Sequence, residues 1–187
     1  MISVASRFNR LARALVISAY VLVVEWSRAL FMRTPELVLP ALAFGGAALV
    51  LAAWGWPADR LGLGTSRLGL RVLGGFALGA VLLLPAAVRP GAAPLLPAGL
   101  ALAAVAVSIG EEVAFRGALY AVLEEIGGAP AAVFGSTLLW TLAHALSHPP
   151  AFLGAVAAAG LLLALWRWAC KDLVAPVIAH VIADVTL

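Results

Sequence analysis

The chain has 187 residues, of which 64% are hydrophobic and only 11% are charged. A soluble globular domain has too little interior to hide that much apolar surface, so the composition excludes a soluble enzyme and predicts an integral membrane protein. The net charge is +3, but the basic residues mostly lie between apolar segments, where they orient a membrane protein, and we therefore exclude nucleic-acid binding.

The length allows six or seven membrane helices of about 20 residues joined by short loops. We therefore predict an all-α fold, a single polytopic transmembrane helical bundle that occupies residues 1–187. The apolar segments place the helices, in chain order, at Ala14–Val24, Glu36–Trp56, Leu70–Leu84, Ala98–Ile126, Ala131–Leu146, Ala151–Cys170 and Leu173–Leu187.

Charged residues, prolines and glycines between and within these helices predict further features. Glu25 and Arg28 lie three residues apart at the end of the first helix, and we expect a surface ion pair there. Prolines predict an irregular segment between the third and fourth helices, and Gly127 and Gly128 end the fourth. Lysine and arginine are more frequent in the loops on the N-terminal side of the membrane, which predicts a cytoplasmic N-terminus.

The fourth predicted helix carries three charged residues, Glu111, Glu112 and Arg116. Each charge at the centre of a membrane helix costs roughly 2.5 to 3.5 kcal/mol, so such groups face the protein interior and by default mark a functional site. Glu112 and Arg116 are four residues apart and share one face, which predicts a structural ion pair. Glu111 points about 100° away, and we expect it to face a cavity as a general base.

Two further polar clusters lie on later helices. Trp140 precedes His144 by one turn on the fifth helix, and His180 precedes Asp184 by one turn on the seventh. A lone histidine is usually a core residue, but two of the three histidines lie within predicted spans that accompany a buried carboxylate pair, which favours function. His148 is followed by two prolines, so we expect it at a helix end or in a loop.

Taken in chain order, these three motifs resemble those of the CPBP intramembrane proteases, a family that includes CAAX-processing endopeptidases and bacteriocin-processing or immunity proteins. The resemblance covers Ala98–Leu187, so the catalytic motifs lie within residues 98–187. It implies an intramembrane endopeptidase that hydrolyses a peptide bond of a membrane-anchored protein or of a C-terminal peptide tail. The expected location is the inner membrane of a bacterium.

The resemblance also implies roles for the six site residues. Glu111 would activate a water molecule for attack on the peptide carbonyl, with His144 as its partner. His180 and Asp184 would stabilise the oxyanion or complete the water site, while Glu112 and Arg116 would hold the architecture. The chain departs from the family pattern at Trp140, where phenylalanine is usual, and at Asp184, where asparagine is frequent. An ionised Asp184 cannot donate a hydrogen bond to an oxyanion, so we expect it to orient His180 or to be protonated.

Metal dependence is left open by the sequence. Glu111, His144 and His180 offer the two-histidine, one-glutamate set of some catalytic zinc sites. If Glu111 were a ligand, Glu112 would have to act as the base; the metal-free route needs only Glu111, His144 and a shared water.

Two other functions are compatible with buried polar groups of this kind. A non-catalytic membrane immunity or binding protein would keep the protease pocket without cutting. A proton-coupled transporter would also carry buried ionisable groups, but it predicts two similar halves, and the sequence shows no such internal symmetry.

Overall fold

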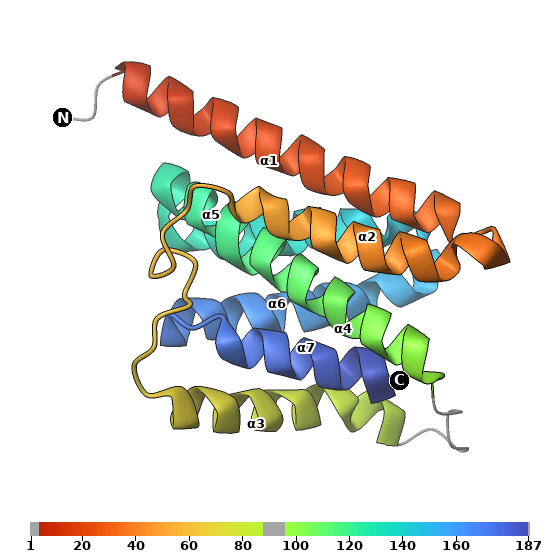
Figure 1. Cartoon of the computed structure of the whole chain (residues 1–187). Helices are drawn as coiled ribbons and strands as arrows, with labels where there is room; N and C mark the ends of the chain where they lie inside the picture. The colour runs from red at the N-terminus through yellow and green to blue at the C-terminus, as the bar shows by residue number, and fades with distance from the viewer. Residues whose placement is uncertain (1–3, 88–95, 187) are drawn as a thin grey trace.

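The computed structural model describes residues 4–87 and 96–186 (Figure 1), and within these ranges every regular element is a helix. The predicted all-α fold is therefore confirmed. In chain order the elements are α1 (Val4–Phe31), η1 (Pro35–Leu37), α2 (Val38–Val50), η2 (Leu51–Ala53), α3 (Leu68–Ala87), α4 (Ala98–Glu111), η3 (Glu112–Leu119), α5 (Tyr120–Ala143), η4 (His144–Leu146), η5 (Pro150–Phe152), α6 (Leu153–Cys170) and α7 (Val174–Thr186).

Within the described ranges, five helical segments are long and apolar enough to cross a membrane, and α7 is a shorter apolar helix. The longest of them, Ala98–Leu146, is broken at Gly127 and Gly128, whose φ angles of −137° and 68° are not helical. The predicted end of the fourth helix at these glycines is confirmed. The break divides the segment into two helical parts, one before and one after the glycines. The molecule is a polytopic helical bundle, as the composition predicts.

Two predicted boundaries near the N-terminal half are wrong. Helix α1 runs to Phe31, well beyond the expected end at Val24, so Glu25 and Arg28 lie inside it. Helix α3 continues through Pro85 to Ala87, so the proline lies in the last turn, where only two residues follow it and the disruption that it causes stays at the helix end. The other prolines expected in the irregular segment fall partly in residues 88–95, which lie outside the described residues.

The helices that hold the polar motifs are covered on several sides. Helix α1 lies along α2 and α5, α2 packs on α4, α5 on α6, and α3 on α7 (Figure 1). The α2–α4 contact brings the two backbones together, since a Cβ added at Gly46 would lie 2.5 Å from the carbonyl oxygen of Ala106. This close packing holds the C-terminal end of α4, and with it the carboxylate motif, deep in the bundle.

Small residues also set the distance between α3 and α7. A Cβ added at Gly75 would lie 2.6 Å from the Cβ of Ile178, and one at Gly79 would lie 3.0 Å from the Cδ1 of Ile182. Close approach of helices through glycines four residues apart is typical of membrane bundles, where van der Waals packing drives association.

Gly75→Leu is expected to destabilise the bundle by about 1–3 kcal/mol, because the larger side chain would force α3 away from Ile178. The measurement is the free energy of unfolding in mixed detergent micelles. Gly69→Leu is the matched control, since Gly69 lies on the same helix with no atom within 4 Å of an added Cβ. Equal stability of the two variants would show that the α3–α7 contact can relax without cost.

Candidate active site

The carboxylate motif lies where α4 passes into the π-helical segment η3, Glu112–Leu119. All eight residues of η3 are buried. The prediction of one regular helix over Ala98–Ile126 is therefore wrong in this segment. π-Helical turns within α-helices are rare and frequently occur at functional sites, because they change the direction of the side chains and open the backbone hydrogen-bond ladder.

Glu111 receives hydrogen bonds at both carboxylate oxygens. Its Oε2 accepts a bond of 2.7 Å from Trp140 Nε1, and its Oε1 accepts a bond of 2.7 Å from Arg28 Nη2. His144 Nε2 lies 3.6 Å from Oε2. The structure thus brings Glu111 and His144 together, as expected, but Glu111 is also paired with an arginine that the sequence assigned elsewhere.

That arginine corrects a prediction about the first helix. Arg28 does pair with Glu25, but the pair is not on the surface: the Glu25 side chain is 2% exposed and that of Arg28 is 10% exposed. Helix α1 docks on the rest of the bundle, where Trp26 Nε1 donates to the carbonyl oxygen of Leu142. Glu25 and Arg28 lie on the face of α1 that packs on the bundle, so they lie close to Glu111.

Glu112 is the centre of a second network. The predicted ion pair is present, with Arg116 Nη1 3.1 Å from Glu112 Oε1, and both side chains are fully buried. The same oxygen lies 2.9 Å from His180 Nδ1. Arg116 also donates to the carbonyl oxygen of Gly160 and lies 4.3 Å from the ring centroid of Trp140. Glu112 therefore links the helix of the carboxylate motif to α7.

Asp184 lies on the other side of the His180 ring. Its Oδ2 is 3.4 Å from His180 Nε2 and accepts a bond of 2.8 Å from Ser108 Oγ. Both ring nitrogens of His180 thus face carboxylates, Glu112 at one and Asp184 at the other. The structure thus brings Asp184 and His180 together, and an orienting role for Asp184 stays a prediction. Ser108 was missed, because a serine within an apolar helix carries no distinctive signal.

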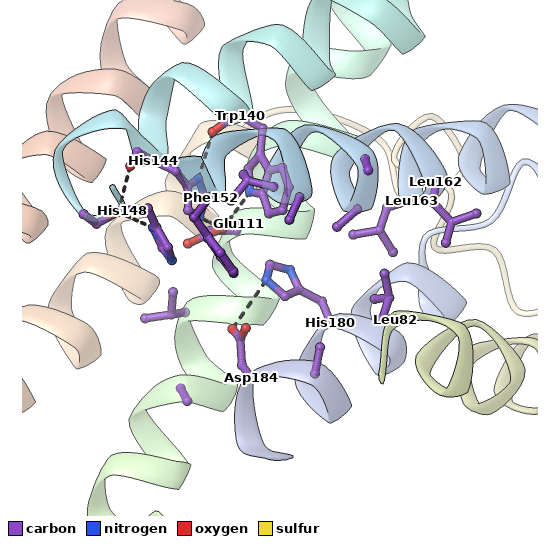
Figure 2. Close-up of a pocket in the computed structure, with 18 of the residues that line it drawn as sticks. Leu82, Glu111, Trp140, His144, His148, Phe152, Leu162, Leu163, His180 and Asp184 are labelled. Atoms are coloured by element: carbon purple, nitrogen blue, oxygen red, sulfur yellow. Dashed lines mark hydrogen bonds and ion pairs between the residues drawn. The ribbon is translucent and has the colours of Figure 1, made fainter. Parts of the chain in front are cut away.

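A cavity of about 770 Å³ is lined by Arg28, Glu111, His144, His180 and Asp184, but not by Glu112 or Arg116. Figure 2 shows Glu111, Trp140 and His144 gathered on one side of His180 and Asp184, with Leu82, Leu162 and Leu163 on the other. One part of the wall is therefore polar and the other is formed by leucines of α3 and α6.

A sequence model of the Rce1-like family, described as type II CAAX prenyl endopeptidase Rce1-like, matches residues 93–186 of the chain. The chain belongs to the Rce1-like family. No curated protein and no solved structure matches it. The resemblance to CAAX-processing proteases, expected from the three motifs, is confirmed, and the molecule is a membrane peptidase. The matched range contains all six candidate site residues, which lie between α4 and α7, whereas α1 with Glu25 and Arg28 lies outside it.

His148 lies at the edge of the Rce1-like site. It follows η4 in a turn, so its predicted place at a helix end is confirmed, and it lines the cavity. Its ring stacks on Phe152 with centroids 5.2 Å apart and lies 5.3 Å from the ring of His144. Burial lowers the pKa of the His148 imidazole, so it is neutral at neutral pH.

Two of the three residues that the sequence offers as a possible zinc ligand set, His144 and His180, make other contacts in this Rce1-like protein. His180 directs both nitrogens at carboxylates other than Glu111, and His144 Nδ1 lies 2.8 Å from the carbonyl oxygen of Trp140. In the part of the chain that the structure describes, no group of three or more His, Cys, Asp and Glu side chains could hold a metal ion. We derive no step through a metal.

Proposed function

We propose that this chain is an intramembrane endopeptidase in which Glu111 activates a water molecule with the help of His144. The observation that carries the proposal is the pairing of these two side chains in the wall of a cavity inside an apolar helical bundle (Figure 2). A carboxylate and an imidazole within reach of one water are the groups that general-base hydrolysis requires.

The hydrogen bond of His144 supports a role for its other nitrogen. Nδ1 lies beside the carbonyl oxygen of Trp140, which can only accept, so Nδ1 carries the proton. Nε2 of the neutral ring is then a hydrogen-bond acceptor. Glu111 Oε2, which lies 3.6 Å from Nε2, is a second acceptor. A water molecule beside this pair donates one hydrogen bond to each of the two groups and directs a lone pair at the substrate carbonyl.

Hydrolysis then follows in two steps. The water oxygen bonds to the carbonyl carbon, its proton passes to Glu111, and the electrons of the C=O double bond move to the carbonyl oxygen. The C–N bond then breaks, and Glu111 returns the proton to the leaving nitrogen, which gives a carboxylic acid and an amine. Glu112, Arg116, His180 and Asp184 act in this proposal by holding α4, η3 and α7 around the reacting groups.

The substrate class follows from the family and from the cavity wall. The family is described as a CAAX prenyl endopeptidase, and Leu82, Leu162 and Leu163 provide an apolar surface beside the polar groups. We propose a membrane-anchored protein or a C-terminal peptide tail as the substrate, lipidated near the scissile bond. We further propose a bacterial inner membrane as the location, with the N-terminus in the cytoplasm.

The test compares the membrane proteomes of cells that express the wild type and Glu111→Ala. The expected result is a set of C-terminal or membrane-proximal fragments that appears only with the wild type, and cleavage of a matching prenylated reporter peptide by purified protein. Identical proteomes and an intact reporter would reject the enzyme. A biological effect that persists in Glu111→Gln would instead favour the non-catalytic immunity or binding protein.

His144→Ala is expected to lower kcat by about 10²–10⁴-fold, because the water loses one of the two acceptors that orient it. The measurement is the steady-state rate of reporter cleavage in proteoliposomes. His148→Ala is the matched control, since this ring lies on the same segment and lines the same cavity but is hydrogen-bonded to Ser147 rather than to Glu111 or to the His144 ring. Equal losses in the two variants would contradict the specific role of His144.

A further inference from the structure

The proposed hydrolysis needs a group that stabilises the negative charge on the carbonyl oxygen. His180 is the residue expected from the sequence, but its Nδ1 lies 2.9 Å from Glu112 and its Nε2 lies 3.4 Å from Asp184. Glu112 occupies Nδ1 by a hydrogen bond, whereas Nε2 makes only the longer contact with Asp184, so this ring offers an oxyanion one donor at most. Oxyanion holes use several preorganised donors, which leaves room for a second donor in this cavity.

Arg28 has the position and the charge for this task. Its Nη2 donates to Glu111 Oε1 at 2.7 Å, and the residue lines the same cavity as Glu111 and His144. Its bonds to Glu25 and Glu111 both leave from Nη2, so among the described residues no acceptor occupies Nη1. A guanidinium is a rigid planar fork, which places the Nη1 donors beside the carboxylate that activates the water.

Burial increases the effect of this cation. The side chain of Arg28 is 10% exposed and those of Glu25 and Glu111 are 2% exposed. Charge interactions are stronger in such a low-dielectric site than in water, and an arginine keeps its charge there because it is not deprotonated in proteins. Glu25 fixes the guanidinium from the adjacent turn of α1, so the donor is positioned before the substrate binds.

We infer that Arg28 is a catalytic residue of this protein, which donates from Nη1 to the carbonyl oxygen of the substrate as the water held by Glu111 attacks. The inference rests on the proposed function and adds to it a residue from α1, outside the range that matches the family. During attack the C=O electrons move to the oxygen beside Arg28, and they return when the C–N bond breaks.

A purely structural role for Arg28 and a role in binding the oxyanion predict different effects of substitution on folding and on kcat. If Arg28 only balances charge, removing it leaves Glu25 and Glu111 without a cation, and neutralising one of them at the same time restores the balance. If Arg28 acts on the oxyanion, the restored balance recovers folding but not catalysis. The double variant Glu25→Gln/Arg28→Gln separates the two roles.

The experiment measures kcat and KM for a prenylated reporter peptide in proteoliposomes, with the melting temperature of each variant in micelles. The variants are Arg28→Gln, Arg28→Lys and the double variant, and the control is Arg33→Gln, an exposed arginine just after α1. We expect Arg28→Gln and the double variant to lose about 10²–10³-fold in kcat with little change in KM, as for removal of one oxyanion donor. Arg28→Lys, which keeps the cation, is expected to recover part of this loss.

The outcomes are distinguishable from failure of the proposed function. A wild type that does not cleave, or a Glu111→Ala variant that does, overturns the endopeptidase and this inference together. If the wild type cleaves and Glu111→Ala does not, the endopeptidase stands. Wild-type kcat in the double variant would then overturn the role of Arg28 alone, and a raised kcat in Arg28→Gln would do so too, since it would identify Arg28 as a restraint on Glu111.

Discussion

Glu111→Gln is expected to abolish detectable peptide-bond cleavage while the protein stays folded. Glutamine has nearly the shape of glutamate, but it cannot take a proton from the attacking water. General-base catalysis typically contributes about 10²–10⁴-fold, so a loss of at least this size is expected in kcat. The measurement is the initial rate of reporter cleavage by protein reconstituted in liposomes.

The matched control for this variant is Glu124→Gln. Glu124 lies on α5 in the same long helical segment, but its side chain is partly exposed and pairs with Lys171 away from the cavity. We expect it to keep the wild-type rate. Cleavage by Glu111→Gln at the wild-type rate would show that another residue is the base.

Arg116→Met is expected to cost about 3–5 kcal/mol of stability, the largest loss that we predict for a single substitution. Arg116 and Glu112 are fully buried, and methionine would leave the Glu112 carboxylate without its arginine in the bundle interior. The measurement is the free energy of unfolding in mixed micelles, together with the yield of folded protein.

Two variants show whether the buried charge is the cause. Glu112→Gln/Arg116→Met removes both charges and is expected to recover a large part of the stability. Arg60→Met breaks a more exposed ion pair, that of Arg60 with Glu125, and is expected to cost at most about 1 kcal/mol. A loss in Arg116→Met no greater than in Arg60→Met would show that water or another group satisfies Glu112.

The sequence predicted the fold class and the main polar motifs because charged and imidazole side chains are conspicuous in apolar helices. The pairing of Glu112 with Arg116 followed from their spacing along one helix. The contact of Glu112 with His180 did not, because it joins residues on α4–η3 and α7 and depends on how these helices pack. The π-helical turn was missed for the same reason, since no composition signal distinguishes it from an α-helix.

Arg28 shows most clearly where local spacing is insufficient. Its i,i+3 relation to Glu25 predicted the ion pair correctly, but whether the pair faces lipid, water or protein depends on the helix surface that α1 presents to its neighbours. The predicted end of α1 at Val24 is too early, because charged residues that are typical of a membrane-helix end lie inside this helix. A charge pair that lies within a helix, rather than after it, must find its partners inside the bundle.

The separation of Arg28 from Glu111 also has a consequence for biosynthesis. The two residues are 83 positions apart in the chain, so at roughly 5–20 residues per second the ribosome completes Arg28 several seconds before Glu111. During that interval Glu25 is the one of its two carboxylate partners that Arg28 can pair with. The ion-pair network that holds the first helix against the bundle is therefore completed only when a segment that is synthesised much later arrives.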